Sequence, residues 1–228
     1  MGSDDLFHKR KAKLKENTSR HKASRMPYQK VLIVTEGTKT EPIYFKEVID
    51  YYEINTANVR ISGECGSDPI SVFNFAVELY HQETIKDDPF DRVYCVFDQD
   101  SYHLGTNKYK QALDKIGSIK PKETFFAITS VPSFEYWFIL HFTHTTAQFF
   151  PTTTKSVGDA VLNKLLDLWP EYTKSMSGTF LKLLPDLEYA KSNASRSLDA
   201  ANATYTDNPT THVHELVEFL QNIKDLDK

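Results

Sequence analysis

Short apolar runs alternate with longer amphipathic stretches along the first half of the chain. Four runs rich in β-branched and aromatic residues are typical of buried strands, and the stretches between them repeat apolar residues at helical spacing. The expected strands cover residues 30–35, 58–62, 92–97 and 124–129, and the expected helices cover residues 42–52, 68–86 and 108–116. Alternating strands and helices predict an α/β fold, in which helices flank a Rossmann-like parallel sheet.

The pattern changes after residue 131, where helical spacing dominates. Apolar residues there predict helices over residues 133–142, 156–169, 186–205 and 211–226, separated by Pro, Gly and Asn. We therefore expect an α/β core over residues 28–131, followed by a helical C-terminal region over residues 132–228 that packs on this core.

Residues 1–27 have no hydrophobic period and are rich in basic residues, which predicts a flexible arm. Residues 1–30 contain nine Lys or Arg and three Asp or Glu, so they carry +6 and the rest of the chain carries −10, for a total of −4. A basic arm suits binding to the phosphate backbone of nucleic acid, because that binding is electrostatic. A disordered terminus that keeps the protein in solution explains the same charge equally well.

Composition narrows the class of protein. With 228 residues, of which 40% are hydrophobic and 13% aromatic, the chain is long and apolar enough for a substantial core. Its two cysteines suggest no disulfide framework, and each is expected to be a small buried residue in a reducing compartment. A run of about 18 apolar residues and a signal-peptide pattern are both absent, so we expect a cytoplasmic protein that does not enter a membrane.

Two acidic motifs follow strands of the predicted sheet. The strand at residues 92–97 runs into Asp98 and Asp100, and the strand at residues 30–35 runs into Glu36. Close like charges disfavour each other's ionised forms, so either a divalent cation offsets them or they form only a polar turn. If the two strands are neighbours, Glu36, Asp98 and Asp100 converge at the carboxyl edge of the sheet, where open parallel sheets bind ligands. Carboxylate oxygens in that number suit Mg²⁺ or Mn²⁺.

Two other glutamates are candidates for the same site, and each has a structural alternative. In a functional role, Glu41 supports the metal ligands or binds a second metal. The structural alternative is that Glu41 only stabilises the N-terminus of the adjacent helix. Glu135 lies in an apolar helical stretch, where a carboxylate needs a partner. Glu135 is one of two things: an additional catalytic carboxylate, or a residue with no catalytic role. In the second case it forms a structural ion pair or lies on an exposed face.

Three segments of the chain resemble the RloB-like family: VTEGTKTEPIYF (34–45), SVPSFEYWFILHF (130–142) and DNPTTHVHELV (207–217). A glutamate after the first strand and Asp-x-Asp after a later strand also resemble the signature of the Toprim domain. The resemblance implies a Toprim-like fold and a nuclease of prokaryotic anti-phage defence, often encoded beside a partner ATPase. It also implies that Glu36 is the Toprim glutamate and that Asp98 and Asp100 bind the metal.

The chain departs from the fuller Toprim pattern Asp-x-Asp-x-Asp, because Tyr102 occupies the third acidic position. This departure puts a second metal site in doubt. His103, the next residue, could replace a ligand or act as a general acid or base. A solvent-exposed loop histidine is the alternative.

The expected function is therefore a divalent-metal-dependent nuclease, an effector of anti-phage defence that hydrolyses phosphodiester bonds of RNA, including tRNA, or of DNA. One alternative is a non-catalytic Toprim-like subunit that binds nucleic acid or regulates an ATPase complex. A phosphatase with Asp98 as nucleophile and Asp100 as acid is less favoured, because two strands and an acidic loop precede its Asp-x-Asp motif. Nucleic acid and a partner ATPase are the expected partners, and a homodimer stays open.

Overall fold

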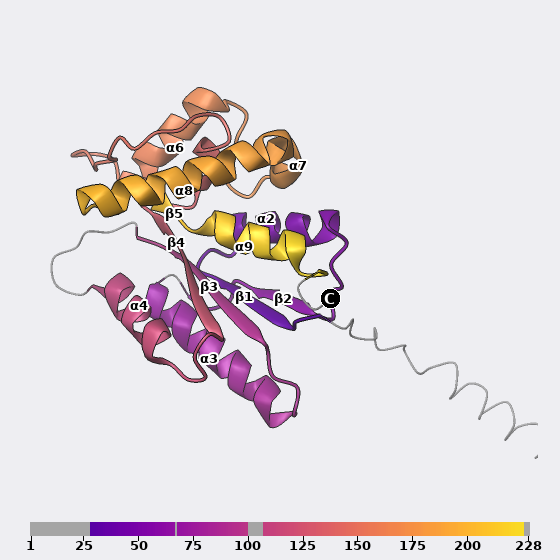
Figure 1. The fold of residues 1–228 in the computed structure, drawn as a ribbon. Coiled ribbons are helices and arrows are strands. Elements are labelled where there is room, and N and C mark those ends of the chain that lie inside the picture. The colour runs from indigo at the N-terminus through magenta and orange to yellow at the C-terminus, as the bar shows by residue number, and fades with distance from the viewer. Residues whose placement is uncertain (1–27, 67, 100–106, 226–228) are drawn as a thin grey trace, which may run out of the picture.

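A five-stranded sheet forms the centre of the molecule (Figure 1). The computed structural model describes residues 28–66, 68–99 and 107–225. The strands are β1 (Val31–Thr35), β2 (Val59–Ser62), β3 (Arg92–Asp98), β4 (Phe125–Val131) and β5 (Thr210–Thr211), in the spatial order β2-β1-β3-β4-β5. The first four strands are parallel, and β5 runs antiparallel to β4. The predicted α/β fold with a largely parallel sheet is confirmed.

The register of the sheet brings the ends of its central strands together. Thr35 of β1 pairs with Val96 of β3, and Asp98 of β3 pairs with Ser130 of β4. The five residues of β1 are all buried, as expected for a strand that is covered on both faces. The loops that follow β1, β3 and β4 therefore leave the sheet from the same edge.

Helices cover both faces of the sheet (Figure 1). On one face lie α3 (Pro69–Ile85) and α4 (Lys108–Ser118), and on the other lie α2 (Thr40–Tyr51) and α9 (Val213–Asn222). The Asp68 carboxylate accepts hydrogen bonds from the backbone N–H groups of Ile70 and Ser71, and Pro69 occupies the first helical position. Asp68 therefore caps the N-terminus of α3, where it satisfies backbone donors that have no partner within the helix.

Alternate residues of the strands enter two separate cores, as the two-residue period of a strand requires. The core beneath α3 and α4 receives Leu32 and Val34 of β1 together with Cys95 and Phe97 of β3. The larger core receives the intervening strand residues and continues into the C-terminal region, where Trp137 and Phe180 are fully buried.

The C-terminal region is helical, as predicted, but its boundaries differ from the prediction. Its elements before α9 are α5 (Glu135–Ile139), α6 (Val157–Leu168), α7 (Thr179–Leu183), the 3₁₀ helix η1 (Leu184–Asp186) and α8 (Leu187–Thr204). The helix expected over residues 133–142 is only five residues long. The backbone carbonyl of Leu140 accepts a hydrogen bond from the Asn193 side chain just after α5 ends. The short elements α7 and η1 follow Gly178 in a segment for which no helix was predicted.

The helix predicted from residue 211 begins later, at Val213, because the chain first pairs with the sheet. Thr210 and Thr211 form β5 beside Val131 and Ser130. The C-terminal region therefore adds a strand to the sheet of the α/β core.

The division of the chain at residue 131 stays a prediction, and the basic arm over residues 1–27 lies outside the described residues. Within the part of the chain that the structure describes, no helix is long and apolar enough to cross a membrane.

An ion-pair cluster lies where the first strand begins, at the opposite edge of the sheet from the loops described above. The Nζ atom of Lys30, a buried residue, lies 2.6 Å from Glu83 Oε2 of α3 and 2.7 Å from Asp88 Oδ2. It also donates a hydrogen bond of 2.7 Å to the backbone carbonyl of Asp88. Hydrogen bonds from Lys30 and Lys86 lower the pKa of Glu83 to about 2, so the carboxylate is charged in the folded protein.

Replacing Glu83 with Gln should destabilise the protein by about 1–2 kcal/mol at pH 7, because the hydrogen bond from a charged donor is weakened. The folded pKa of Glu83 lies below its ordinary value of 4.5, so its contribution is present above pH 4.5 and is lost as the pH falls towards 2. Urea unfolding of the wild type and of Glu83→Gln at pH 7 and pH 3.5 measures this difference. The exposed Glu78→Gln on the same helix is the control. A stability difference that is equal at both pH values would contradict the assignment.

Candidate active site

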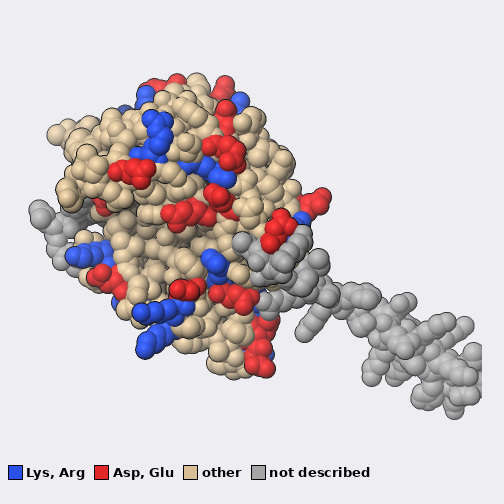
Figure 2. Space-filling view, viewed as in Figure 1, with Lys and Arg blue, Asp and Glu red and all other residues tan. Residues whose placement is uncertain are grey.

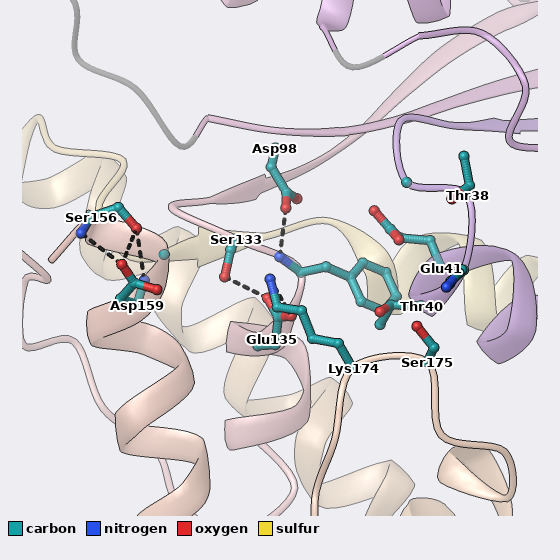
Figure 3. A pocket seen from close by; sticks show the side chains of 14 residues that line it. Thr38, Thr40, Glu41, Asp98, Ser133, Glu135, Ser156, Asp159, Lys174 and Ser175 are labelled. Atoms are coloured by element: carbon teal, nitrogen blue, oxygen red, sulfur yellow. Dashed lines mark hydrogen bonds and ion pairs between the residues drawn. The ribbon is translucent and has the colours of Figure 1, made fainter.

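An open cleft of about 360 Å³ lies at the carboxyl edge of the parallel strands (Figure 3). Its walls come from the loop after β1 with the start of α2, from the end of β3 and from the segment after β4. The N-terminal turn of α6 and the loop before α7 complete it from the C-terminal region. The cleft is thus formed by both the α/β part and the helical part of the chain.

Glu36 and Asp98 are brought together by the pairing of β1 with β3. The backbone N–H of Glu36 donates to the carbonyl of Val96 at 2.9 Å, which continues the pairing beyond β1. The Glu36 carboxylate accepts a hydrogen bond of 3.1 Å from the backbone N–H of Asp98. The predicted convergence of Glu36 and Asp98 is therefore present in the structure.

Asp98 ends β3 and points into the cleft (Figure 3). Its Oδ2 atom accepts a hydrogen bond of 3.0 Å from the backbone N–H of Phe134, in the segment after β4. The pKa of Asp98 is raised well above its ordinary value, chiefly by burial and then by the charges of Glu41 and Glu135. A carboxyl group in this position resists ionisation unless a positive charge is added nearby.

Glu41 lies in the first turn of α2, is buried, and lines the same cleft. Burial raises its pKa most, and the charge of Glu135 raises it further, whereas the backbone N–H groups of Glu41 and Gly37 lower it. Its position thus agrees both with a role at the cleft and with stabilisation of the helix N-terminus. Gly37 allows this arrangement, because a Cβ atom there would contact the Glu41 carboxylate and lie 2.7 Å from its Cδ atom.

Glu135 is the first residue of α5 and lines the cleft as a third carboxylate beside Asp98 and Glu41. It is only 4% exposed, so it does not lie on an exposed face. Its Oε2 atom accepts a hydrogen bond of 2.8 Å from the Ser133 hydroxyl, and Lys174 Nζ lies 3.5 Å from Oε1. The buried Glu135 carboxylate therefore has a hydrogen-bond donor and an ion-pair partner, and the ion pair is made across the cleft.

The structure also adds residues that sequence patterns did not single out. Lys174, from the loop before α7, and Ser133 both contact Glu135, and Asp159 lines the cleft from the first turn of α6. Lys174 stands in a polar loop with no distinctive motif, so only the tertiary structure reveals its place. Asp100 and His103 lie outside the described residues, and their predicted roles stay predictions.

The cleft offers the donor chemistry of a divalent-metal site. Carboxylate oxygens are the ligands that Mg²⁺ and Mn²⁺ prefer, and a cation would offset the burial and the repulsion that raise the pKa of Asp98. Among the described residues, however, no three His, Cys, Asp or Glu side chains are arranged to hold a metal ion. Metal binding by Glu36, Asp98 and Glu41, with Asp100 as a further ligand, therefore stays a prediction.

The fold and the cleft define an α/β protein with an acidic site at the carboxyl edge of a parallel sheet. Its sequence matches the RloB-like protein family over residues 31–220, and the chain belongs to this family. The match includes every segment that forms the cleft, and it confirms the resemblance to the RloB-like family. The resemblance to the Toprim domain stays a prediction. No curated protein and no solved structure matches the chain.

Replacing Gly37 with Ala should destabilise the protein by about 1–2 kcal/mol, because the new methyl group displaces the buried Glu41 carboxylate. In a Glu41→Ala background the same change should cost at least about 1 kcal/mol less, since the clash is gone. Urea unfolding of the four proteins of this cycle measures the coupling.

Gly117→Ala is the matched control for the Gly37 substitution. A Cβ atom at Gly117, near the end of α4, would meet nothing within 4 Å. Alanine there should leave stability unchanged or raise it by up to about 1 kcal/mol. Equal effects of Gly37→Ala in the two backgrounds would show that Gly37 and Glu41 are not coupled.

Proposed function

We propose that this RloB-like protein is a divalent-metal-dependent nuclease of the Toprim type, with its active site in the acidic cleft. One observation carries the proposal: the carboxylates of Glu36, Glu41, Asp98 and Glu135 gather at the edge where open parallel sheets bind ligands. Strongly perturbed carboxyl groups in a cleft are typical of functional sites. The Toprim-like order of motifs, a glutamate after β1 and Asp-x-Asp after β3, supports the reaction class.

The residues divide naturally between two roles. Glu36 and Asp98, joined by a backbone hydrogen bond, would hold Mg²⁺ or Mn²⁺ together with Asp100. A bound metal of this kind neutralises charge on phosphoryl oxygens and makes water a better nucleophile. Glu41, whose pKa is raised by burial and by the charge of Glu135, would exchange a proton at its carboxylate as a general acid or base.

The substrate in this proposal is nucleic acid, with RNA, including tRNA, preferred over DNA by analogy with other toxic effectors. Acidic and basic side chains are interspersed over the face seen in Figure 2. Nucleic acid on this face would meet local charged groups rather than one broad basic surface. A role in anti-phage defence and control by a partner ATPase belong to the same proposal and rest on the family resemblance.

Cleavage of single-stranded DNA, duplex DNA and total tRNA should depend on Mg²⁺ or Mn²⁺ and stop in EDTA. Asp98→Asn and Glu36→Gln should each lower the cleavage rate by about a hundredfold or more, because each removes a charged group from the reacting centre. Asp114→Asn, an exposed substitution on α4, should cleave like the wild type. Gel assays with labelled substrates measure these rates.

Cleavage that survives both Asp98→Asn and Glu36→Gln would contradict the proposal. Hydrolysis of p-nitrophenyl phosphate without cleavage of nucleic acid would instead favour a phosphatase. Nucleic-acid binding without cleavage, even after addition of a candidate partner ATPase, would favour a non-catalytic subunit.

A further inference from the structure

The loop between α6 and α7 is held firmly at the mouth of the cleft. Glu47 of α2 accepts hydrogen bonds from the backbone N–H groups of Gly178 at 2.5 Å and Phe180 at 2.8 Å. Tyr172 and Thr179 on either side of the loop are buried. The loop is therefore fixed to α2, the helix that also carries Glu41, so its side chains have a defined position relative to the carboxylates.

Lys174 projects from this loop into the cleft (Figure 3). Its ammonium group lies 3.5 Å from the Glu135 carboxylate, yet the lysine side chain is 62% exposed whereas that of Glu135 is 6% exposed. Ser175, the next residue, has a φ of 73°, a left-handed conformation that turns the chain sharply beside Lys174. The lysine thus reaches a buried carboxylate from the solvent side.

The ion pair between Lys174 and Glu135 is easily exchanged. The ammonium group is largely exposed and lies 3.5 Å from the carboxylate, so water competes for it and the lysine can leave the pair. Ser133 continues to donate a hydrogen bond to Glu135 if the lysine leaves. A phosphate oxygen would offer the ammonium a charge-assisted hydrogen bond, which is stronger than this pair.

We propose that Lys174 exchanges Glu135 for a phosphate oxygen of nucleic acid and is the phosphate-binding residue that the helical region supplies to the cleft. This inference rests on the proposed function, because it names how the same site holds its substrate. The carboxylates of the cleft repel a phosphodiester, so a cation opposite them is needed for the anion to approach. Lys174 meets that need from a loop that is anchored in place.

A purely structural lysine would behave differently from a phosphate-binding one. If Lys174 only neutralises Glu135, its loss lowers stability and leaves the salt dependence of nucleic-acid binding unchanged. If it contacts phosphate, each lost contact reduces the slope of log Kobs against log salt by about 0.7 for a single strand, because one fewer counterion is released.

The test is fluorescence anisotropy of labelled 12-nucleotide single strands of DNA and RNA, in EDTA, at several NaCl concentrations between 50 and 200 mM. Lys174→Gln should weaken binding about three- to tenfold at 50 mM and lower the salt slope by about 0.7. Lys174→Arg should restore both, since arginine also donates to phosphate. Lys182→Gln, an exposed substitution on α7 outside the cleft, is the control with the same loss of charge.

In the binding assay, either of two results would overturn the inference: a salt slope that Lys174→Gln changes no more than Lys182→Gln does, or no binding by the wild type. Urea unfolding of Lys174→Gln checks that weaker binding does not reflect unfolding. Metal-dependent cleavage by Lys174→Gln at the wild-type KM would overturn this inference alone. A reduced slope in Lys174→Gln, without cleavage by any protein, would support the lysine contact and count against the proposed nuclease.

Discussion

Repulsion between carboxylates at one edge of the sheet is the constraint on which the rest of the structure depends. Asp98 is surrounded by the charges of Glu41, Glu135 and Glu36, and burial removes the water that would screen them. The surrounding structure offsets part of this cost through backbone N–H groups, the Ser133 hydroxyl and the ammonium of Lys174. Clusters of perturbed carboxyl groups in a cleft are typical of functional sites, which supports the proposed active site.

The core explains how the cluster is kept rigid. Trp137 Nε1 of α5 donates a hydrogen bond of 2.8 Å to the Tyr44 hydroxyl of α2, and both side chains are fully buried. The ring of Phe134 packs edge-on against Tyr44 at 5.7 Å between centroids. The two helices that carry Glu41 and Glu135, α2 and α5, are therefore joined directly through the core. Supporting contacts of this kind hold functional side chains in a fixed geometry.

Part of this arrangement can be predicted from the sequence, and part of it depends on tertiary contacts that no local sequence pattern shows. Short apolar runs that end on acidic residues predict the parallel strands, and the pairing of these strands places Glu36 beside Asp98 as expected. β5 is only two residues long, too short to show a period, so Thr211 was assigned to a helix. Lys174 meets Glu135 through tertiary packing across 39 positions of the chain, and no local pattern encodes that contact.

The central claim is that Glu36 and Asp98 form part of a divalent-metal site. Electron paramagnetic resonance of free Mn²⁺, titrated with the wild type, Asp98→Asn and Glu36→Gln, tests it most directly, because it needs neither substrate nor partner. The wild type should remove Mn²⁺ from solution, and each variant should bind it about tenfold more weakly or worse. Failure of the wild type to bind Mn²⁺, or equal binding by all three proteins, would contradict the claim.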